Sequence, residues 1–345
     1  PCMDAPAWWL GLSGGMDSMV LLESLAELGR DHALPPLRAI HVHHGLHPEA
    51  DDWAEHCLRE TAVRNIPLVI ERVQIPSGAS IEAQARKARY AAFAKHMGAS
   101  DCLLLAHHRD DQLETLLFRM LRGTGLRGLA GMPISRPLSR GKLLRPLLEQ
   151  PRTELLAWAK AKGLTWIEDP ANHDSRFARS ALRHDLLPRL RQGWPAVDNN
   201  LLMLASHARE ANELLDERAA EDVQWLSGDL DDPWLNAWAS LQLAGLLTLS
   251  SARRSNLLRY WLRSHGLRAS QRRLQTLEQQ LDGASDSQPI VELEGARVQR
   301  SSGRLWLVDP EASSAGVQQI EALGAMALRD GNGVLSLRLP SVVAE

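Results

Sequence analysis

The chain has 345 residues, of which 44% are hydrophobic and 23% charged, with a formal net charge of −3. This length predicts two or three domains, and the charge excludes a uniformly basic protein. No apolar run is long enough to span a membrane, and the three scattered cysteines fit neither a disulfide framework nor a structural zinc site. We therefore expect a cytoplasmic globular protein with no membrane partner.

The first half of the chain alternates apolar runs with helical patterns. Buried parallel strands are predicted at 8–12, 37–42, 68–73, 102–106 and 143–148. Helices are predicted at 17–29, 50–65, 80–98 and 110–122, with a further helix that begins at Pro151. This alternation predicts an α/β fold with a doubly wound parallel sheet, whose ligands bind at the carboxyl ends of the strands.

A glycine turn follows the first predicted strand, with the sequence Ser13-Gly14-Gly15-Met16-Asp17-Ser18. Backbone N–H groups and the positive end of a helix meet at such a turn, which suits a phosphate group. The glycines allow close approach to the main chain, and the Asp17 carboxylate suits Mg²⁺. The alternative is an ordinary capped turn from strand to helix. The sequence lacks the Walker and Gly-x-Gly-x-x-Gly patterns and resembles the pyrophosphate loop of ATP pyrophosphatases.

A second polar block, His107–Thr115, lies where the fourth predicted strand ends and a helix begins. Asp111 and Glu114 are three residues apart, so they share one face of the first helical turn. Two carboxylates on one face suit a metal ion or an ammonium ligand, and the pair His107 and His108 suits contact with phosphate or proton transfer. The alternative is an Asp N-cap followed by a glutamate in the first turn.

Basic residues gather in segments that contain no acids. Seven lie between Arg119 and Arg145, and seven more lie between Arg253 and Arg273. The first segment includes a glycine-rich loop from Arg122 to Leu129, which suits nucleotide or RNA phosphates or forms a simple helix end. Such segregation is typical of faces that bind nucleic acid, and solvated helix faces are the alternative.

The second half has a different pattern. Residues 194–283 are helical almost throughout, which predicts a small all-α domain. Short strands are predicted at 290–293, 296–300 and 305–308. We therefore expect three domains: a catalytic α/β domain at 1–190, an all-α domain at 191–285, and a partial α+β module at 286–345. Whether the last module is complete stays open.

Seven blocks in the first 190 residues resemble, in order, those of the tRNA(Ile)-lysidine synthetase family. They are Ser13–Ser18, His41–Leu46, Glu82–Tyr90, His107–Thr115, Arg122–Leu129, Arg145–Leu148 and Trp166–Pro188. A weaker resemblance, to the family's helical domain, lies at Arg259–Leu262. The chain departs from the family at His43, His47 and Ser180, where Asn, Arg and Asn are usual.

The resemblance implies a two-step reaction. ATP adenylates the C2 oxygen of the wobble cytidine in an isoleucine tRNA with a CAU anticodon, and free lysine then attacks C2 to give lysidine. The ATP contacts that it implies are Ser13, Gly14, Gly15, Met16, Asp17, Ser18, His43 and Arg86. The catalytic residues that it implies are Asp17, Asp111, Glu114, His107 and Arg122, with Asp17 and Asp111 on Mg²⁺ and with Asp111 and Glu114 on lysine. The tRNA contacts that it implies are Arg179, Arg183, Arg253, Arg254, Arg259, Arg272 and Arg273.

Other functions remain open at this stage. A tRNA 2-thiolation enzyme shares the loop and the adenylation step, but it needs cysteines for sulfur transfer or a cluster, and the chain has no Cys-x-x-Cys. A small-molecule amide ligase of the same superfamily would not need basic helical appendages. A non-enzymatic RNA-binding module with an inactive site is disfavoured by the intact Ser13, Asp17, Asp111 and Glu114. The oligomeric state stays open, with a homodimer as one option.

Overall fold

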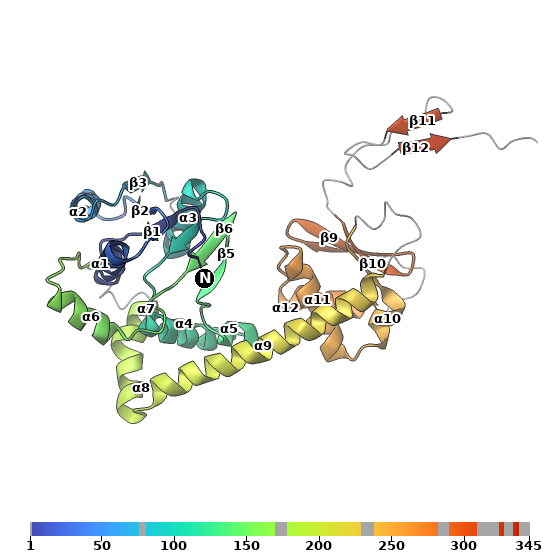
Figure 1. Ribbon diagram of the computed structural model, residues 1–345. Coiled ribbons are helices and arrows are strands. Elements are labelled where there is room, and N and C mark those ends of the chain that lie inside the picture. Colours follow the sequence, from blue (N-terminus) through green and yellow to red (C-terminus); the bar gives the residue numbers. More distant parts are fainter. Residues whose placement is uncertain are drawn as a thin grey trace, which may run out of the picture. The chain divides into compact units, whose positions relative to one another are not determined.

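The computed structural model describes residues 2–75, 81–169, 178–228, 238–281, 290–308, 324–327 and 334–337. The chain forms two compact units, Pro1–Arg209 and Glu210–Glu345 (Figure 1). No helix in these described ranges is long and apolar enough to cross a membrane. The finer division into three domains at residues 190 and 285 stays a prediction.

A six-stranded sheet forms the centre of the first unit, in the order β3-β2-β1-β4-β6-β5. Its strands are β1 (Trp8–Gly11), β2 (Leu37–His43), β3 (Leu68–Arg72), β4 (Cys102–Leu104), β5 (Ser135–Leu138) and β6 (Gly141–Leu144). Five of them run parallel, and β5 pairs antiparallel with β6 at one edge. The predicted parallel α/β fold is confirmed. The fifth predicted strand corresponds to β6, which begins two residues earlier than predicted and ends at Leu144.

Helices cover both faces of this sheet, as the alternation along β1 shows. Trp8 and Leu10 belong to a core that Met19 of α1 (Met16–Asp31) and Cys57 of α2 (Ala50–Val63) share. Trp9 points to the opposite face, because successive strand residues alternate, and packs in a second core with Phe93 of α3 (Ile81–His96). The chain is therefore doubly wound, as the sequence predicts.

A helical layer follows around α4 (Arg109–Leu121). It comprises α5 (Leu126–Leu129), α7 (Ala178–Ala181), the π-helical turn η2 (Leu182–Leu186) and α8 (Leu187–Gly193), whereas α6 (Arg152–Ala161) packs on α1. Leu113 and Leu117 of α4 share a small core with Leu182 and Leu187. This packing fixes η2 against the face of α4 that carries the acidic residues. Residues 170–177 of the predicted block Trp166–Pro188 lie outside the described residues.

The second unit combines helices with a four-stranded antiparallel sheet of order β7-β10-β9-β8. Its helices are α10 (Leu243–Thr248), α11 (Ser251–Ser264), α12 (Gln271–Leu281) and the later part of α9 (Val197–Ser227). Its strands are β7 (Ser240–Gln242), β8 (Ile290–Leu293), β9 (Ala296–Ser301) and β10 (Arg304–Val308), with a separate pair β11 (Gly324–Ala327) and β12 (Val334–Leu337). Trp261 and Leu277 of the helices share one core with Val298 and Leu305 of the strands, so helices and sheet form a single packed body.

Candidate active site

The loop between β1 and α1 has a conformation that only glycine adopts readily. Gly14 has a φ of +86°, and a Cβ there would lie 2.6 Å from Ile167 Cδ1 and 3.2 Å from Cys57 Sγ. The Ile167 N–H donates to Gly14 O at 3.0 Å, and the N–H of Gly15 donates to Ser13 Oγ at 3.3 Å. Within the described chain no side chain caps α1 at Gly15, so its first N–H groups face the loop. An uncapped helix N-terminus beside glycines suits a phosphate ligand.

We predict that Gly14→Ala lowers the free energy of unfolding by ~2–4 kcal/mol, because a left-handed φ and overpacking against Ile167 both cost energy. The matched control is Gly15→Ala, where φ is −73° and the nearest heavy atom to a new Cβ is Ser13 Oγ at 3.6 Å. That change should cost less than about 1 kcal/mol. Urea denaturation of the two variants checks the prediction, and equal losses would contradict it.

His108 caps the N-terminus of α4. Its Nδ1 accepts from the N–H of Asp111 at 3.4 Å, and Asp111 Oδ2 accepts from the N–H of His108 at 3.0 Å. This reciprocal pair is a capping box, with histidine in place of the usual Ser or Thr. Asp111 is therefore the third residue of the helix rather than its N-cap, and its second carboxylate oxygen remains available for other contacts.

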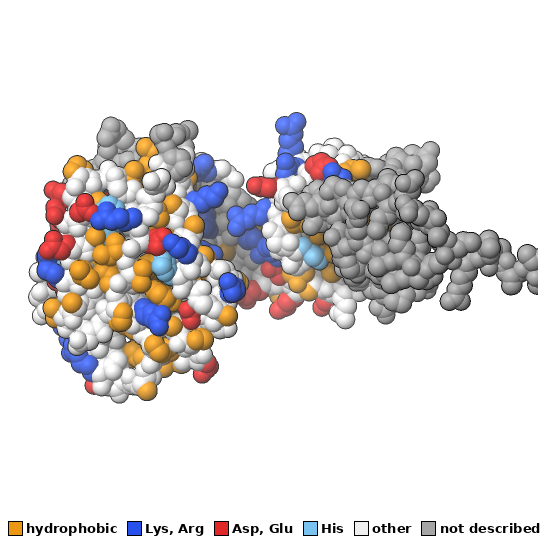
Figure 2. Space-filling model, turned by 90° about the horizontal axis from the view of Figure 1, so that it is seen from above, with side chains coloured by type: hydrophobic (Ala, Val, Ile, Leu, Met, Phe, Trp, Pro, Cys, Tyr) orange, Lys and Arg blue, Asp and Glu red, His pale blue; other side chains and the backbone are white. Residues whose placement is uncertain are grey.

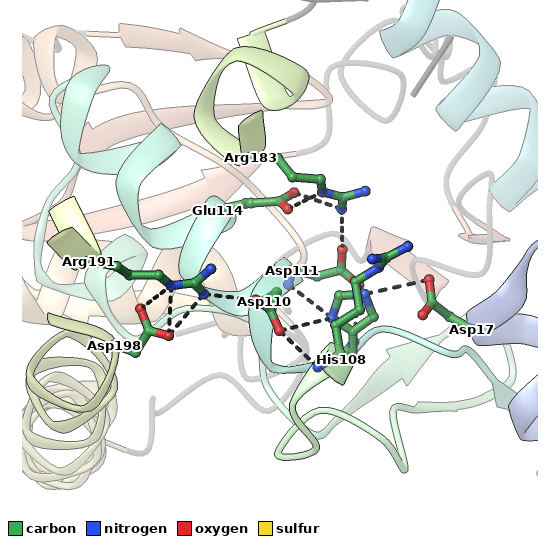
Figure 3. Close-up of polar contacts among 9 residues, drawn as sticks. Asp17, His108, Asp110, Asp111, Glu114, Arg183, Arg191 and Asp198 are labelled. Carbon is green, nitrogen blue, oxygen red and sulfur yellow. Dashed lines mark hydrogen bonds and ion pairs between the residues drawn. The ribbon is translucent and has the colours of Figure 1, made fainter. Parts of the chain in front are cut away.

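The buried imidazole of His108 also brings Asp17 and Asp111 together. Its Nε2 lies 3.5 Å from Asp17 Oδ2 and 3.5 Å from Asp111 Oδ2 (Figure 3). Burial acts to lower the pKa of His108, but the nearby carboxylates of Asp17, Asp111 and Asp110 outweigh it and raise the pKa. The neighbouring strands β1 and β4 lead into these two segments, where the strand order of the sheet reverses. Ligands of doubly wound folds bind at this switch point.

Glu114 and Asp111 both bind the guanidinium of Arg183 (Figure 3). Arg183 Nε donates to Glu114 Oε1 at 2.6 Å, and its NH2 group donates to Asp111 Oδ1 at 3.1 Å and to Glu114 Oε2 at 3.2 Å. The Glu114 side chain is only 2% exposed. Burial raises the pKa of Glu114, with a contribution from the charge of Asp111, although Arg183 acts in the opposite direction.

A cavity of about 250 Å³ lies beside this ion-paired cluster, and Asp110, Glu114, Arg152, Arg183 and Arg191 contribute to its lining. Asp110 belongs to a separate network. Its carboxylate accepts from the Arg152 N–H at 3.0 Å and from Arg191 at 2.8 Å (Figure 3). The cavity is therefore bordered by acids and guanidinium groups that already compensate one another.

Other predicted residues lie outside this group. His43 Nε2 is 3.2 Å from Asp51 Oδ1 and 3.3 Å from Arg72, and Arg122 ends α4 with its guanidinium 5.0 Å from the Phe118 ring. Among the described residues, no hydrogen bond, ion pair or ring contact joins either residue to Asp17, Asp111 or Glu114. The pKa of His107 falls to about 3, because of burial and then the charges of Arg145, Arg86, Arg179 and Arg89. His107 is therefore uncharged at neutral pH.

The predicted tRNA contacts in the second unit differ in their surroundings. Arg253 binds Asp222 at 2.5 Å, whereas the exposed Arg259 donates to the neutral Gln271 at 2.7 Å and pairs with no acid among the described residues. Arg272 and Arg273 are exposed, and Arg254 is half-buried. Figure 2 shows Lys and Arg side chains interspersed with hydrophobic and acidic ones on the visible face of the first unit.

The sequence pointed to the pair His107 and His108 but placed only His107 among the catalytic residues, whereas His108 is the one that contacts both Asp17 and Asp111. The sequence feature that could have identified His108 is its position directly before the predicted helix, which is the N-cap position. The sequence also assigned Arg183 to RNA alone, whereas its guanidinium binds the two acids of α4.

Two family models match parts of this chain. The model of a PP-loop domain family matches residues 3–190, and that of the TilS substrate binding domain matches residues 241–306. The chain is 46% identical over 340 residues to tRNA(Ile)-lysidine synthase of Pseudomonas putida, covering 99% of this chain and 78% of that protein. The corresponding protein of Pseudomonas aeruginosa is 46% identical over 341 residues, covering 98% of this chain and 77% of that protein.

A solved structure of a U34-tRNA thiolase from Methanococcus maripaludis has a TM-score of 0.48 and 19% identity, covering 60% of this chain and 73% of that chain. That likeness is too low to bear on activity. The relatives at 46% identity cover nearly the whole chain and more than two thirds of their own length. The chain therefore belongs to the tRNA(Ile)-lysidine synthase family.

Proposed function

We propose that this protein ligates free lysine to C2 of the wobble cytidine of an isoleucine tRNA with a CAU anticodon, and that it converts ATP to AMP and pyrophosphate. One observation carries the proposal. A glycine loop suited to phosphates and a pair of carboxylates suited to ammonium groups meet at the switch point of the sheet, with His108 between them. The family matches over both parts of the chain support the same reaction.

The Ser13–Ser18 loop binds the phosphates of ATP, and Asp17 and Asp111 are the residues that would hold Mg²⁺. Asp17 Oδ1 is buried and has no hydrogen-bond partner among the described residues, as expected for an oxygen that acts as a metal ligand. The described residues contain no group of three metal-binding side chains. Mg²⁺ fits nonetheless, because it usually takes one or two carboxylates together with substrate phosphates and water. When bound, it would offset negative charge on the phosphates.

In the first step the C2 oxygen of cytidine bonds to the α-phosphorus of ATP, and the bond to pyrophosphate breaks. The N–H groups of the loop and the start of α1 are placed to stabilise charge on the phosphate oxygens. His107 is uncharged at neutral pH, so it takes part as a hydrogen-bonding group rather than as a cation. Arg86 and Arg122 supply positive charge at the periphery. The cytidine must leave the anticodon stack to reach this site.

In the second step the ε-amine of lysine bonds to C2, the bond from C2 to the AMP oxygen breaks, and the amine loses a proton. Asp111 and Glu114 receive the ammonium groups of lysine. Arg183 now makes three hydrogen bonds to these carboxylates, so a lysine ammonium must displace its guanidinium. The released Arg183 then becomes available to RNA phosphate, in keeping with the prediction that it contacts tRNA. No protein nucleophile is required.

Sulfur transfer is disfavoured by the surroundings of the cysteines. Cys2, Cys57 and Cys102 are all buried and free of disulfides. Burial raises the pKa of Cys57 to about 12 and that of Cys102 to about 12, so both remain thiols at neutral pH. A thiol is a poor nucleophile compared with a thiolate, and a 2-thiolation mechanism that uses these residues is therefore unfavourable.

The proposed reaction is tested by incubating the protein with ATP, labelled lysine and unmodified tRNA, and by omitting each component in turn. We expect label on the RNA only when ATP is present, together with release of AMP and pyrophosphate. Label without ATP, or label on a tRNA whose wobble base is not cytidine, would contradict the proposal. Cytoplasmic location and a homodimer remain predictions, which cell fractionation and light scattering would test.

A further inference from the structure

Two arginines contact one tyrosine on the first unit. Arg86 lies one turn before Tyr90 on α3, and its NH2 group donates to Tyr90 Oη at 3.4 Å, with its Cζ 5.0 Å from the ring centroid. Arg136 comes from the edge strand β5, and its Cζ lies 5.1 Å from the same centroid. Segments fifty residues apart in the sequence thus place two guanidinium groups over one ring.

Arg145, just after β6, adds a third guanidinium to this group. Arg145 is only 3% exposed, and its NH1 group donates to Pro133 O at 2.6 Å. Its Nε is buried without a hydrogen-bond partner among the described residues. Burial lowers the pKa of Arg145, and the charges of Arg136 and Arg86 act in the same direction, against the effect of Tyr90.

Carboxylates do not compensate these charges. Within the described ranges, no ion pair joins Arg86, Arg136 or Arg145 to an acid. Other arginines of the chain contrast with them, because Arg64 lies 2.6 Å from Glu23 and Arg191 lies 2.8 Å from Asp110. Like charges repel one another, and burying the Arg145 guanidinium with an unsatisfied N–H adds a further cost, although Arg86 is exposed and Arg136 is half-buried.

We propose that Arg86, Arg136 and Arg145 form, around Tyr90, a site for a phosphodiester group of the RNA strand next to the wobble nucleotide. Guanidinium groups present paired N–H donors that match phosphate oxygens, and the phenol adds a further donor. The phosphates of ATP already have their own site in the Ser13–Ser18 loop. The cluster acts on His107 through the charges of Arg145 and Arg86, so it lies within electrostatic reach of the end of β4.

This inference rests on the proposed function and assigns Arg86, predicted from the sequence to contact ATP, to the RNA instead. The ligand chemistry is that of a phosphate ester, which ATP and RNA share. Affinities for tRNA and for ATP must therefore be measured separately on the same variants.

The test compares Arg136→Gln with Arg140→Gln in the full-length chain. Arg140 is exposed on the same β5–β6 hairpin, so both changes remove one positive charge from one structural element. We expect Arg136→Gln to weaken tRNA binding about 5- to 10-fold near 0.15 M salt and to reduce the slope of log K against log salt by about 0.7–0.9. Arg140→Gln should change the affinity less than about 2-fold, and ATP affinity should be unchanged in both.

Equal tRNA affinities and salt slopes for the two variants would overturn the site. A loss of ATP affinity in Arg136→Gln with unchanged tRNA affinity would assign the cluster to the nucleotide and would also overturn it. Thermal melting of both variants shows whether the hairpin still folds. A third variant, Arg136→Lys, keeps the charge but loses the paired N–H donors of the guanidinium. It should retain the salt slope of tRNA binding while it loses part of the affinity. Because wild-type lysine transfer is measured independently, failure of this site leaves the proposed reaction standing.

Discussion

Replacing Glu114 with Gln should reduce lysine transfer to tRNA by about 10³-fold while the protein stays folded. The Glu114 side chain is 2% exposed, and Glu114 and Asp111 both bind the guanidinium of Arg183. Glu114 is therefore one of the two negative charges that bind the ammonium group of lysine. Removing one partner of a buried charge pair costs about 3–5 kcal/mol, which corresponds to roughly 10²–10⁴-fold in rate. The measurement is kcat/KM for lysine. Glu154→Gln, at an exposed position of α6, is the control and should keep full activity.

The same variant tests the electrostatics of the site through the pH dependence of stability. The pKa of Glu114 is raised by burial, so the folded protein holds this proton more tightly than the unfolded chain does. Stability from this residue is therefore complete below pH ~4.5 and falls as pH rises through the raised pKa. Glutamine cannot ionise, so the Glu114→Gln variant does not lose stability in this way as pH rises. The free energy of unfolding of Glu114→Gln, relative to wild type, should therefore be higher at pH 8 than at pH 4. The opposite order in urea denaturation would show that the Arg183 ion pair outweighs burial.

The sequence predicted the central fold well, because buried parallel strands and their crossover helices have strong apolar patterns. It missed β5 and β7, as well as the pair β11 and β12. The segment Ser135-Arg136-Pro137-Leu138 has a proline and no apolar alternation, and an edge strand tolerates both because one side of it needs no ladder bonds. Strand β7 has only three residues and forms by pairing with β10, more than sixty residues later, which no local pattern reveals.

Charge patterns were the less reliable guide. Arginines at helical spacing show which face of a helix is basic, but they do not show which residues of other elements contact that face. Leu182 and Leu187 pack on α4, and this packing turns Arg183 toward Glu114. Likewise, acidic residues of α9 and basic residues of α11 are separate in sequence but pair in the second unit. Arg253 pairs with Asp222 at 2.5 Å, and Arg263 pairs with Asp216 at 2.7 Å. The basic surface left for RNA is therefore smaller than the sequence suggests.

Replacing Asp17 with Asn should stop the first chemical step and leave lysine binding intact. Asn keeps the size of the side chain, so the contact with His108 at 3.5 Å can persist while the negative charge is lost. Because Asp17 Oδ1 has no partner among the described residues, the charge is better explained by a ligand than by the fold. We expect pyrophosphate release in the presence of tRNA and ATP, without lysine, to fall about 10³-fold and the Mg²⁺ requirement to rise.

Asp17→Asn and Glu114→Gln should therefore fail at different steps. Glu114→Gln should still release pyrophosphate and accumulate adenylated tRNA, because its missing charge belongs to the lysine side of the site. Asp17→Asn should bind lysine within about 2-fold of wild type, because the contacts of Arg183 with Glu114 and Asp111 do not involve Asp17. If both variants lost the same step, the two carboxylate sites would act as one, and the separate assignment of a nucleotide end and a lysine end on the two sides of His108 would be wrong.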